Sequence, residues 1–124
     1  MPLRPTHLPT EAELEILHIL WERGSATVRE VHTALSEKRE TGYTTVLKLM
    51  QIMDGKGSVT RKTAERSHLY KPALKRDVTQ RKIVAGVIAK AFNGSACDLV
   101  ECALAHAKGS RTETAKIRAL LAKK

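Results

Sequence analysis

Aromatic residues are scarce in this 124-residue sequence, which has one Trp, one Phe and two Tyr. Much of its 42% hydrophobic content is Ala and Val, whose side chains each bury little area. A core built from such residues is thin, and a small domain buries too little surface to be generously stable alone. We therefore expect burial against a second copy of the chain to add stability.

The sequence also has few cysteines and no long apolar stretch. Cys97 and Cys102 are too few for a disulfide framework, and their spacing of five within an expected helix keeps them from bridging each other. No apolar stretch reaches the length of a signal peptide or a transmembrane helix. The sequence therefore predicts a cytoplasmic protein in a reducing compartment, with no membrane insertion.

Acidic residues are outnumbered by basic ones, thirteen to twenty-two, which gives a net charge of +9. The excess is uneven along the chain. Residues 1–40 carry five Lys and Arg against seven Glu, whereas residues 41–82 carry ten Lys and Arg against three Asp and Glu. This balance favours a polyanionic partner that binds the middle of the chain.

Helix-capping patterns divide the sequence into elements. A small polar residue followed three positions later by Glu, Gln or Asp marks a helix start. Such patterns, together with a further start at Thr41 or Gly42, predict helices over residues 10–24, 27–37, 41–57, 77–93, 95–109 and from 110 onward. Residues 59–64 and 67–72 are expected to form a hairpin with its turn at residues 65–66.

The resulting order is three helices, two strands and three helices. It predicts a mainly α fold with a small β-hairpin: a winged helix-turn-helix domain over residues 1–74 and a three-helix dimerisation domain over residues 75–124. In a winged helix the third helix enters the major groove of DNA, the second braces it, and the hairpin lies beside the backbone.

The third predicted helix opens with residues suited to DNA recognition. Val46 is expected to face the core, which places Thr44, Thr45 and Lys48 on the other side. Threonine can bond base edges, and hairpin cations can bind phosphates. The predicted DNA-binding residues are Tyr43, Thr44, Thr45, Lys48, Arg61, Lys62 and Arg66.

Other interpretations of these residues remain open. Thr44 and Thr45 are also compatible with a plain helix start, and the cations with a solvated surface. A winged helix can serve as a protein–protein interaction module, which would place aromatics on the recognition face. A nonspecific architectural DNA-binding protein would bind all duplexes alike.

A set of ordered motifs resembles the BlaI/MecI penicillinase-repressor family over the whole chain. The motifs are Leu14-Glu15-Ile16-Leu17-His18-Ile19-Leu20-Trp21, Thr27-Val28-Arg29-Glu30-Val31, Tyr43-Thr44-Thr45-Val46, Lys56-Gly57, Leu69-Tyr70-Lys71-Pro72 and Phe92-Asn93-Gly94-Ser95. The resemblance implies a dimeric repressor that binds a palindromic operator in double-stranded DNA. It also implies a membrane sensor metalloprotease as partner, whose signal leads to cleavage in the C-terminal segment.

The chain departs from the family pattern at two places. The family usually has Gln-Arg-Leu where this chain has Gln51-Ile52-Met53, so one frequent cation is missing. The expected cleavage region falls near Gly94-Ser95-Ala96-Cys97, which lacks the Asn-Phe pair found in some members.

Apolar residues in the last fifty positions predict an interface between two copies. They recur at four-residue steps and form a stripe that so short a segment does not easily bury alone. The alternative is that these helices fold back on the first domain as a monomer. The predicted dimerisation residues are Ile83, Val84, Val87, Ile88, Phe92, Leu99 and Leu104.

No catalytic constellation is apparent, so we expect no enzymatic activity and no cofactor. Asp98, Cys102 and His106 lie at four-residue steps on one helix face and are candidate metal ligands. Helix periodicity alone often produces such an alignment, so no metal site is predicted.

Overall fold

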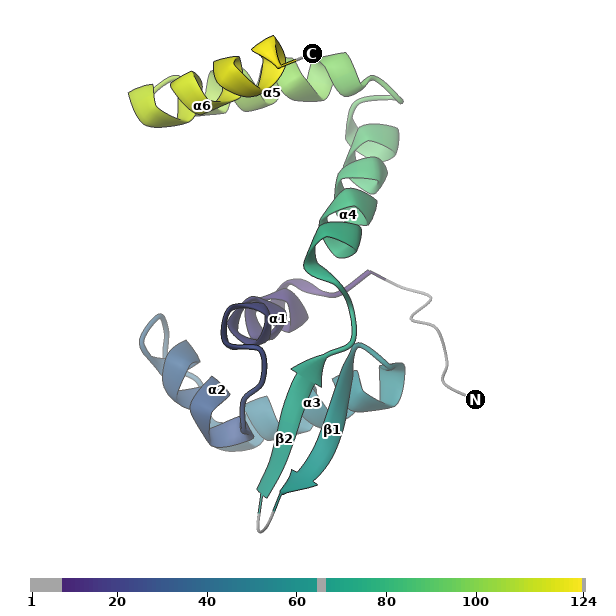
Figure 1. Ribbon diagram of the computed structural model, residues 1–124. Helices are drawn as coiled ribbons and strands as arrows, with labels where there is room; N and C mark the ends of the chain where they lie inside the picture. Colours follow the sequence, from purple (N-terminus) through teal and green to yellow (C-terminus); the bar gives the residue numbers. More distant parts are fainter. Residues whose placement is uncertain (1–7, 65–66, 124) are drawn as a thin grey trace. The chain divides into compact units, whose positions relative to one another are not determined.

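The computed structural model describes residues 8–64 and 67–123 and divides into two compact units, Met1–Gln80 and Arg81–Lys124. Over the described residues the order is three helices, a hairpin and three helices, as the sequence predicts (Figure 1). The elements are α1 (Glu11–Arg23), α2 (Val28–Ser36), α3 (Tyr43–Lys56), β1 (Val59–Ala64), β2 (Ser67–Pro72), α4 (Arg76–Ala91), α5 (Ala96–Ala107) and α6 (Arg111–Ala122).

Reciprocal capping sets the starts of α1 and α2. The backbone N–H of Glu13 donates to Thr10 Oγ1 at 3.2 Å, while the Thr10 N–H donates to Glu13 Oε1 at 2.9 Å. Thr27 and Glu30 make the same pair of bonds at the start of α2. Each box satisfies two backbone donors that a helix start would otherwise leave unpaired. Because this arrangement is local, the sequence predicted both starts correctly.

The third helix is bounded by glycines. Gly42 is its N-cap, without a side-chain cap, and Gly57 follows its last residue with φ 84°. This left-handed conformation suits glycine, and it lets the Gly57 and Ser58 N–H groups bond carbonyls of the last turn. The chain then reverses directly into β1.

The hairpin pairs β1 with β2 in antiparallel register, from Val59 opposite Pro72 to Ala64 opposite Ser67. A further bridge joins Tyr70 of β2 to Ala26, which precedes α2. The Ala26 N–H donates to the Tyr70 carbonyl at 3.0 Å, and the Tyr70 N–H donates back at 2.9 Å. Sequence patterns gave no sign of this bridge, which ties the hairpin to the start of α2.

The core of the first unit is formed by one face of each of α1, α2 and α3, closed by the strands. Its largest fully buried side chains are Tyr70, Ile16, Leu17, Leu20, Met50, Met53, Glu13, Val31, Val46 and Val59. Leu14 and Trp21 of α1 are only partly buried against this cluster. The Trp21 indole N–H donates to the carbonyl of Leu74 at 2.8 Å, so the segment after β2 is held against α1.

The second unit contains most of α4 together with α5 and α6. Ser95 and Ser110 cap α5 and α6, as predicted. The predicted cap of the fourth helix at Asp77 is wrong, because α4 already begins at Arg76 and Asp77 lies in its first turn. An acidic side chain there is still favoured by the helix dipole. Ala107 is the one buried hydrophobic residue in the described part of this unit.

Among the described residues, no single helix is long and apolar enough to cross a membrane. The combined length and composition of α4 and α5 pass that test, but the pair is bent by 102° at the intervening break.

Candidate nucleic-acid interface

One side of α3 is packed into the core and the opposite side is exposed. Val46, Met50 and Met53 are fully buried, as expected for the inner face. Thr44, Thr45 and Lys48, predicted as the recognition residues, are all exposed. Two hydroxyls and an ammonium therefore lie within about one turn of the leading end of α3.

Tyr43, also predicted at the interface, is the first residue of α3, and its side chain is 44% exposed. Its ring contacts the His32 imidazole edge to face, with ring centroids 5.7 Å apart. An exposed aromatic at this position is compatible with either DNA or a protein partner, so Tyr43 alone does not separate the two.

Gln51 and Ile52 extend the exposed side of α3, and sequence reasoning did not include them in the site. Gln51 is exposed, and Ile52 is 44% exposed. Both lie about one turn beyond Lys48, so helical spacing was a sufficient signal for them. The amide of Gln51 can donate to and accept from base edges.

The alternation of β1 separates the two hairpin cations. Arg61 pairs across the strands with the buried Tyr70, and its Nε lies 3.9 Å from Asp54 Oδ2 of α3. Lys62 pairs with Leu69 and therefore lies on the other face. Lys71, which sequence reasoning missed, is exposed and shares that outer face with Lys62. Arg66 lies outside the described residues.

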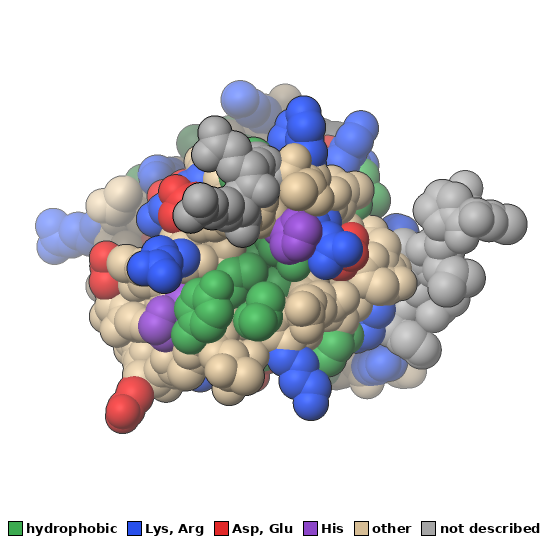
Figure 2. Space-filling view, turned by 90° about the horizontal axis from the view of Figure 1, so that it is seen from below, with side chains coloured by type: hydrophobic (Ala, Val, Ile, Leu, Met, Phe, Trp, Pro, Cys, Tyr) green, Lys and Arg blue, Asp and Glu red, His purple; other side chains and the backbone are tan. Residues whose placement is uncertain are grey.

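One face of the molecule is rich in positive charge. Viewed from the side of the hairpin tip, Lys and Arg side chains are distributed around a small hydrophobic patch, with histidine beside it (Figure 2). Acidic side chains are fewer on this face. Such a surface suits a polyanion that also offers apolar contacts.

Two ion pairs anchor α1 to the elements that carry the site. Lys56 Nζ at the end of α3 donates to Glu13 Oε2 at 2.9 Å, and the Glu13 side chain is 3% exposed. Burial raises the pKa of Glu13, but hydrogen bonds from Lys56 and Thr10 outweigh it and hold that pKa below its ordinary value. The buried carboxylate thus links the start of α1 to the end of α3.

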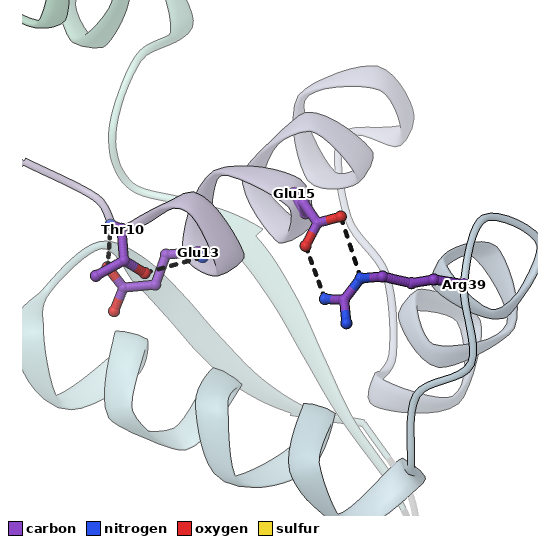
Figure 3. A network of polar contacts seen from close by, with 4 residues as sticks. All are labelled: Thr10, Glu13, Glu15 and Arg39. Carbon is purple, nitrogen blue, oxygen red and sulfur yellow. Dashed lines mark hydrogen bonds and ion pairs between the residues drawn. The ribbon is translucent and has the colours of Figure 1, made fainter.

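The second pair joins Arg39, between α2 and α3, to Glu15 of α1 through two hydrogen bonds of 2.7 and 3.4 Å (Figure 3). The hydrogen bond from Arg39 is the main cause of a lowered pKa at Glu15. Both side chains are substantially exposed, so the pair adds little stability. Its consequence is geometric, because it restrains the loop that leads into α3.

The predicted dimerisation residues are poorly covered within one chain. Val84 and Val87 are 44% and 39% exposed. The remaining members, Ile83, Ile88, Phe92, Leu99 and Leu104, are of intermediate exposure. The described part of the second unit therefore presents an apolar surface that one copy does not bury.

The candidate metal ligands are spread along α5. Cys102 and His106 line a groove between α5 and α6, together with Glu113 of α6, whereas Asp98 does not line it. Over residues 8–64 and 67–123, no three His, Cys, Asp or Glu side chains gather closely enough to hold a metal ion.

The penicillinase repressor family model matches residues 9–123. Two proteins named transcriptional regulator BlaI, from Mycobacterium tuberculosis strains CDC 1551 / Oshkosh and ATCC 25618 / H37Rv, are 37% identical over 83 residues, 66% of this chain. The match covers 57% of each relative, so the chain spans a little over half their length.

A solution structure of the DNA binding domain of the repressor BlaI is 24% identical, covers 61% of this chain and 90% of that one, and superposes with a TM-score of 0.53. This likeness concerns the fold, and it identifies the first unit's arrangement as a winged helix. The family match extends over nearly the whole sequence. The chain therefore belongs to the penicillinase repressor family, which consists of transcriptional regulators and not enzymes.

Proposed function

We propose that this chain is a cytoplasmic, homodimeric transcriptional repressor that binds an inverted-repeat operator in double-stranded DNA. The observation that carries the proposal is the exposed side of α3. Thr44, Thr45 and Lys48 lie there, opposite the buried side of the helix. Threonine hydroxyls and a lysine at the start of a groove-entering helix can read base edges. Hairpin cations fix the register by binding phosphates.

Selection of bound duplexes from a random-sequence library, followed by footprinting, tests this proposal. We expect enrichment of a two-fold symmetric sequence and protection of both half-sites. Binding of all duplexes with equal affinity supports an architectural DNA-binding protein instead. No binding at moderate salt supports a protein–protein interaction module. Either result contradicts the proposal that the chain binds a specific operator.

The two-fold symmetry of such an operator and the apolar surface of the second unit support the proposed dimer. One winged helix contacts few base pairs, so its affinity and specificity are limited. Joining two copies makes the second contact intramolecular, which raises the affinity for paired half-sites. Burial of Val84 and Val87 against their symmetry mates would cover side chains that one chain leaves exposed.

Release by a membrane sensor metalloprotease is the part of the proposal that rests on family resemblance. The segment Gly94-Ser95-Ala96-Cys97 runs from the connection after α4 into the first residues of α5, and Asn93 and Gly94 of that connection are exposed, with φ 49° and 87°. An exposed connection of this kind is accessible to proteolysis. Co-expression with a membrane metalloprotease encoded beside the gene should shorten the chain near this segment. An intact chain under inducing conditions contradicts this step.

A further inference from the structure

The backbone just ahead of α3 is held by a side chain of α2. His32 Nε2 lies 2.8 Å from the carbonyl oxygen of Thr41, nine residues along the chain. A carbonyl only accepts, so Nε2 carries the proton and donates it. Ser36 Oγ also lies 3.4 Å from Nε2, and its own proton goes to the His32 carbonyl at 2.8 Å. Both neighbours of Nε2 are therefore acceptors, which selects one tautomer.

The same imidazole restrains the first side chain of α3. Its ring meets the Tyr43 ring at an interplanar angle of 79°, an edge-to-face contact. Aromatic pairs favour this geometry. Tyr43 is nonetheless 44% exposed, so one part of its ring is held by His32 while another part remains available to a ligand.

The start of α3 depends on contacts of this kind because it has no side-chain cap of its own. Thr10 and Thr27 fix the starts of α1 and α2 through local capping boxes. At α3 the N-cap is Gly42, which has no side chain to contribute. The hydrogen bond from His32 to Thr41, one residue earlier, therefore restrains the backbone where α3 begins.

We propose that His32 is a positioning residue for DNA recognition. It does not read DNA itself; it fixes the start of α3 and the orientation of the Tyr43 ring, so that Tyr43, Thr44 and Thr45 meet the groove together. The inference rests on the proposed function. Displacement of these leading residues alters the base contacts, which carry the sequence information, whereas the phosphate contacts expected from the hairpin cations do not depend on the start of α3.

Three substitutions separate the two contacts of the imidazole. His32→Ala removes both, His32→Phe keeps a ring without the donor, and His32→Gln keeps an amide donor without the ring. Affinity is measured for the selected operator and for a random duplex, at one salt concentration. We expect His32→Ala to lower operator affinity about tenfold while random-duplex affinity changes less than about twofold. His32→Gln should retain most of the operator affinity that His32→Ala loses.

His18→Ala is the matched control. His18 makes a similar edge-to-face contact with Trp21, at 5.4 Å between centroids, but lies on α1. This variant should keep the operator-to-random ratio of the wild type. Amide hydrogen exchange gives a readout independent of DNA: in His32→Ala, exchange should accelerate at the first hydrogen-bonded amides of α3, beginning with Val46, whose N–H donates to the Gly42 carbonyl, and stay unchanged along α1.

The outcomes distinguish this inference from the proposed function. Equal losses on both duplexes with a lowered unfolding temperature show that His32 is merely structural and overturn the inference. So does an unchanged operator-to-random ratio in His32→Ala. If the wild type prefers no duplex at all, the proposed function itself fails and the positioning role fails with it.

Discussion

At the scale of the residue, Glu13 has the clearest link between protonation and structure. Its carboxyl pKa is lowered in the folded protein because the hydrogen bonds from Lys56 and Thr10 outweigh the effect of burial. The folded state therefore binds this proton less readily than the unfolded chain, whose carboxyl has a pKa near 4.5. The resulting stability is present above pH 4.5 and is lost as pH falls below it.

Thermal unfolding followed by circular dichroism from pH 6 to pH 3 checks this prediction. Glu13→Gln should lower the free energy of unfolding by about 1–3 kcal/mol at neutral pH, because the amide keeps one acceptor oxygen for two donors, Lys56 and Thr10, and the ion pair with Lys56 is lost. It should also flatten the acid limb of the stability curve. Glu22→Gln removes an exposed carboxylate from the same helix and should have a smaller effect. Equal effects of the two variants would contradict a special role for Glu13.

Thr45 gives a residue-scale prediction for recognition. Thr45→Ala removes an exposed hydroxyl from the leading turn of α3 and should weaken operator binding by about 1 kcal/mol, roughly fivefold. Binding to random duplex should not change, since nonspecific binding depends on phosphate contacts. Competition binding with both duplexes measures the ratio. Thr112→Ala, on exposed α6, is the control. Equal weakening on both duplexes favours an architectural protein.

Periodicity predicted which residues of α3 face the core, and the burial of Val46 confirms it. The DNA contacts of the exposed residues of α3 stay predictions. The sequence could not reveal the pairing of Glu13 with Lys56, which are 43 residues apart, or that of His32 with Thr41. Such pairs depend on how helices pack in three dimensions, and a single sequence carries no local pattern for them.

At the scale of the element, the hairpin differs from α3 in what it can recognise. Lys62 lies on the outer face of β1 and makes no ion pair with any described residue, whereas Arg61 lies near Asp54. Lys62→Ala should therefore remove one phosphate contact from every duplex, weaken operator and random binding alike, and flatten the salt dependence by about one unit of slope.

Binding isotherms at several salt concentrations measure that slope. Lys116→Ala, which removes an exposed cation from α6, should leave the slope unchanged. A loss confined to the operator would assign Lys62 to base recognition and contradict the prediction. Arg61→Ala should have a smaller effect than Lys62→Ala, since Asp54 already competes for its guanidinium.

Element boundaries were predictable wherever their cause is local. Capping residues placed the starts of α1 and α2, and glycines placed the ends of α1 and α3. The error at Asp77 arose because a capping pattern and an acidic first turn look alike in sequence. The bridge between Ala26 and Tyr70 escaped prediction because two residues 44 positions apart leave no periodic signal.

At the scale of the whole molecule, the uncovered surface of the second unit is the proposed dimer interface. Val87→Asp places a carboxylate in the proposed interface and should shift the protein to monomer at micromolar concentration, as measured by sedimentation velocity. Operator affinity should fall because the two half-sites are then bound independently. Thr33→Asp adds the same charge at an exposed position of α2 and should preserve the dimer. A wild type that sediments as a monomer contradicts the assembly outright.

The hydrogen bond between Trp21 and the Leu74 carbonyl has a practical consequence for such experiments. Trp21 is the sole tryptophan of the sequence, so all indole fluorescence comes from one ring. That ring is partly buried and reports on the joint between β2 and α4. Emission wavelength and quenching by iodide can therefore follow this joint during operator binding without any attached dye.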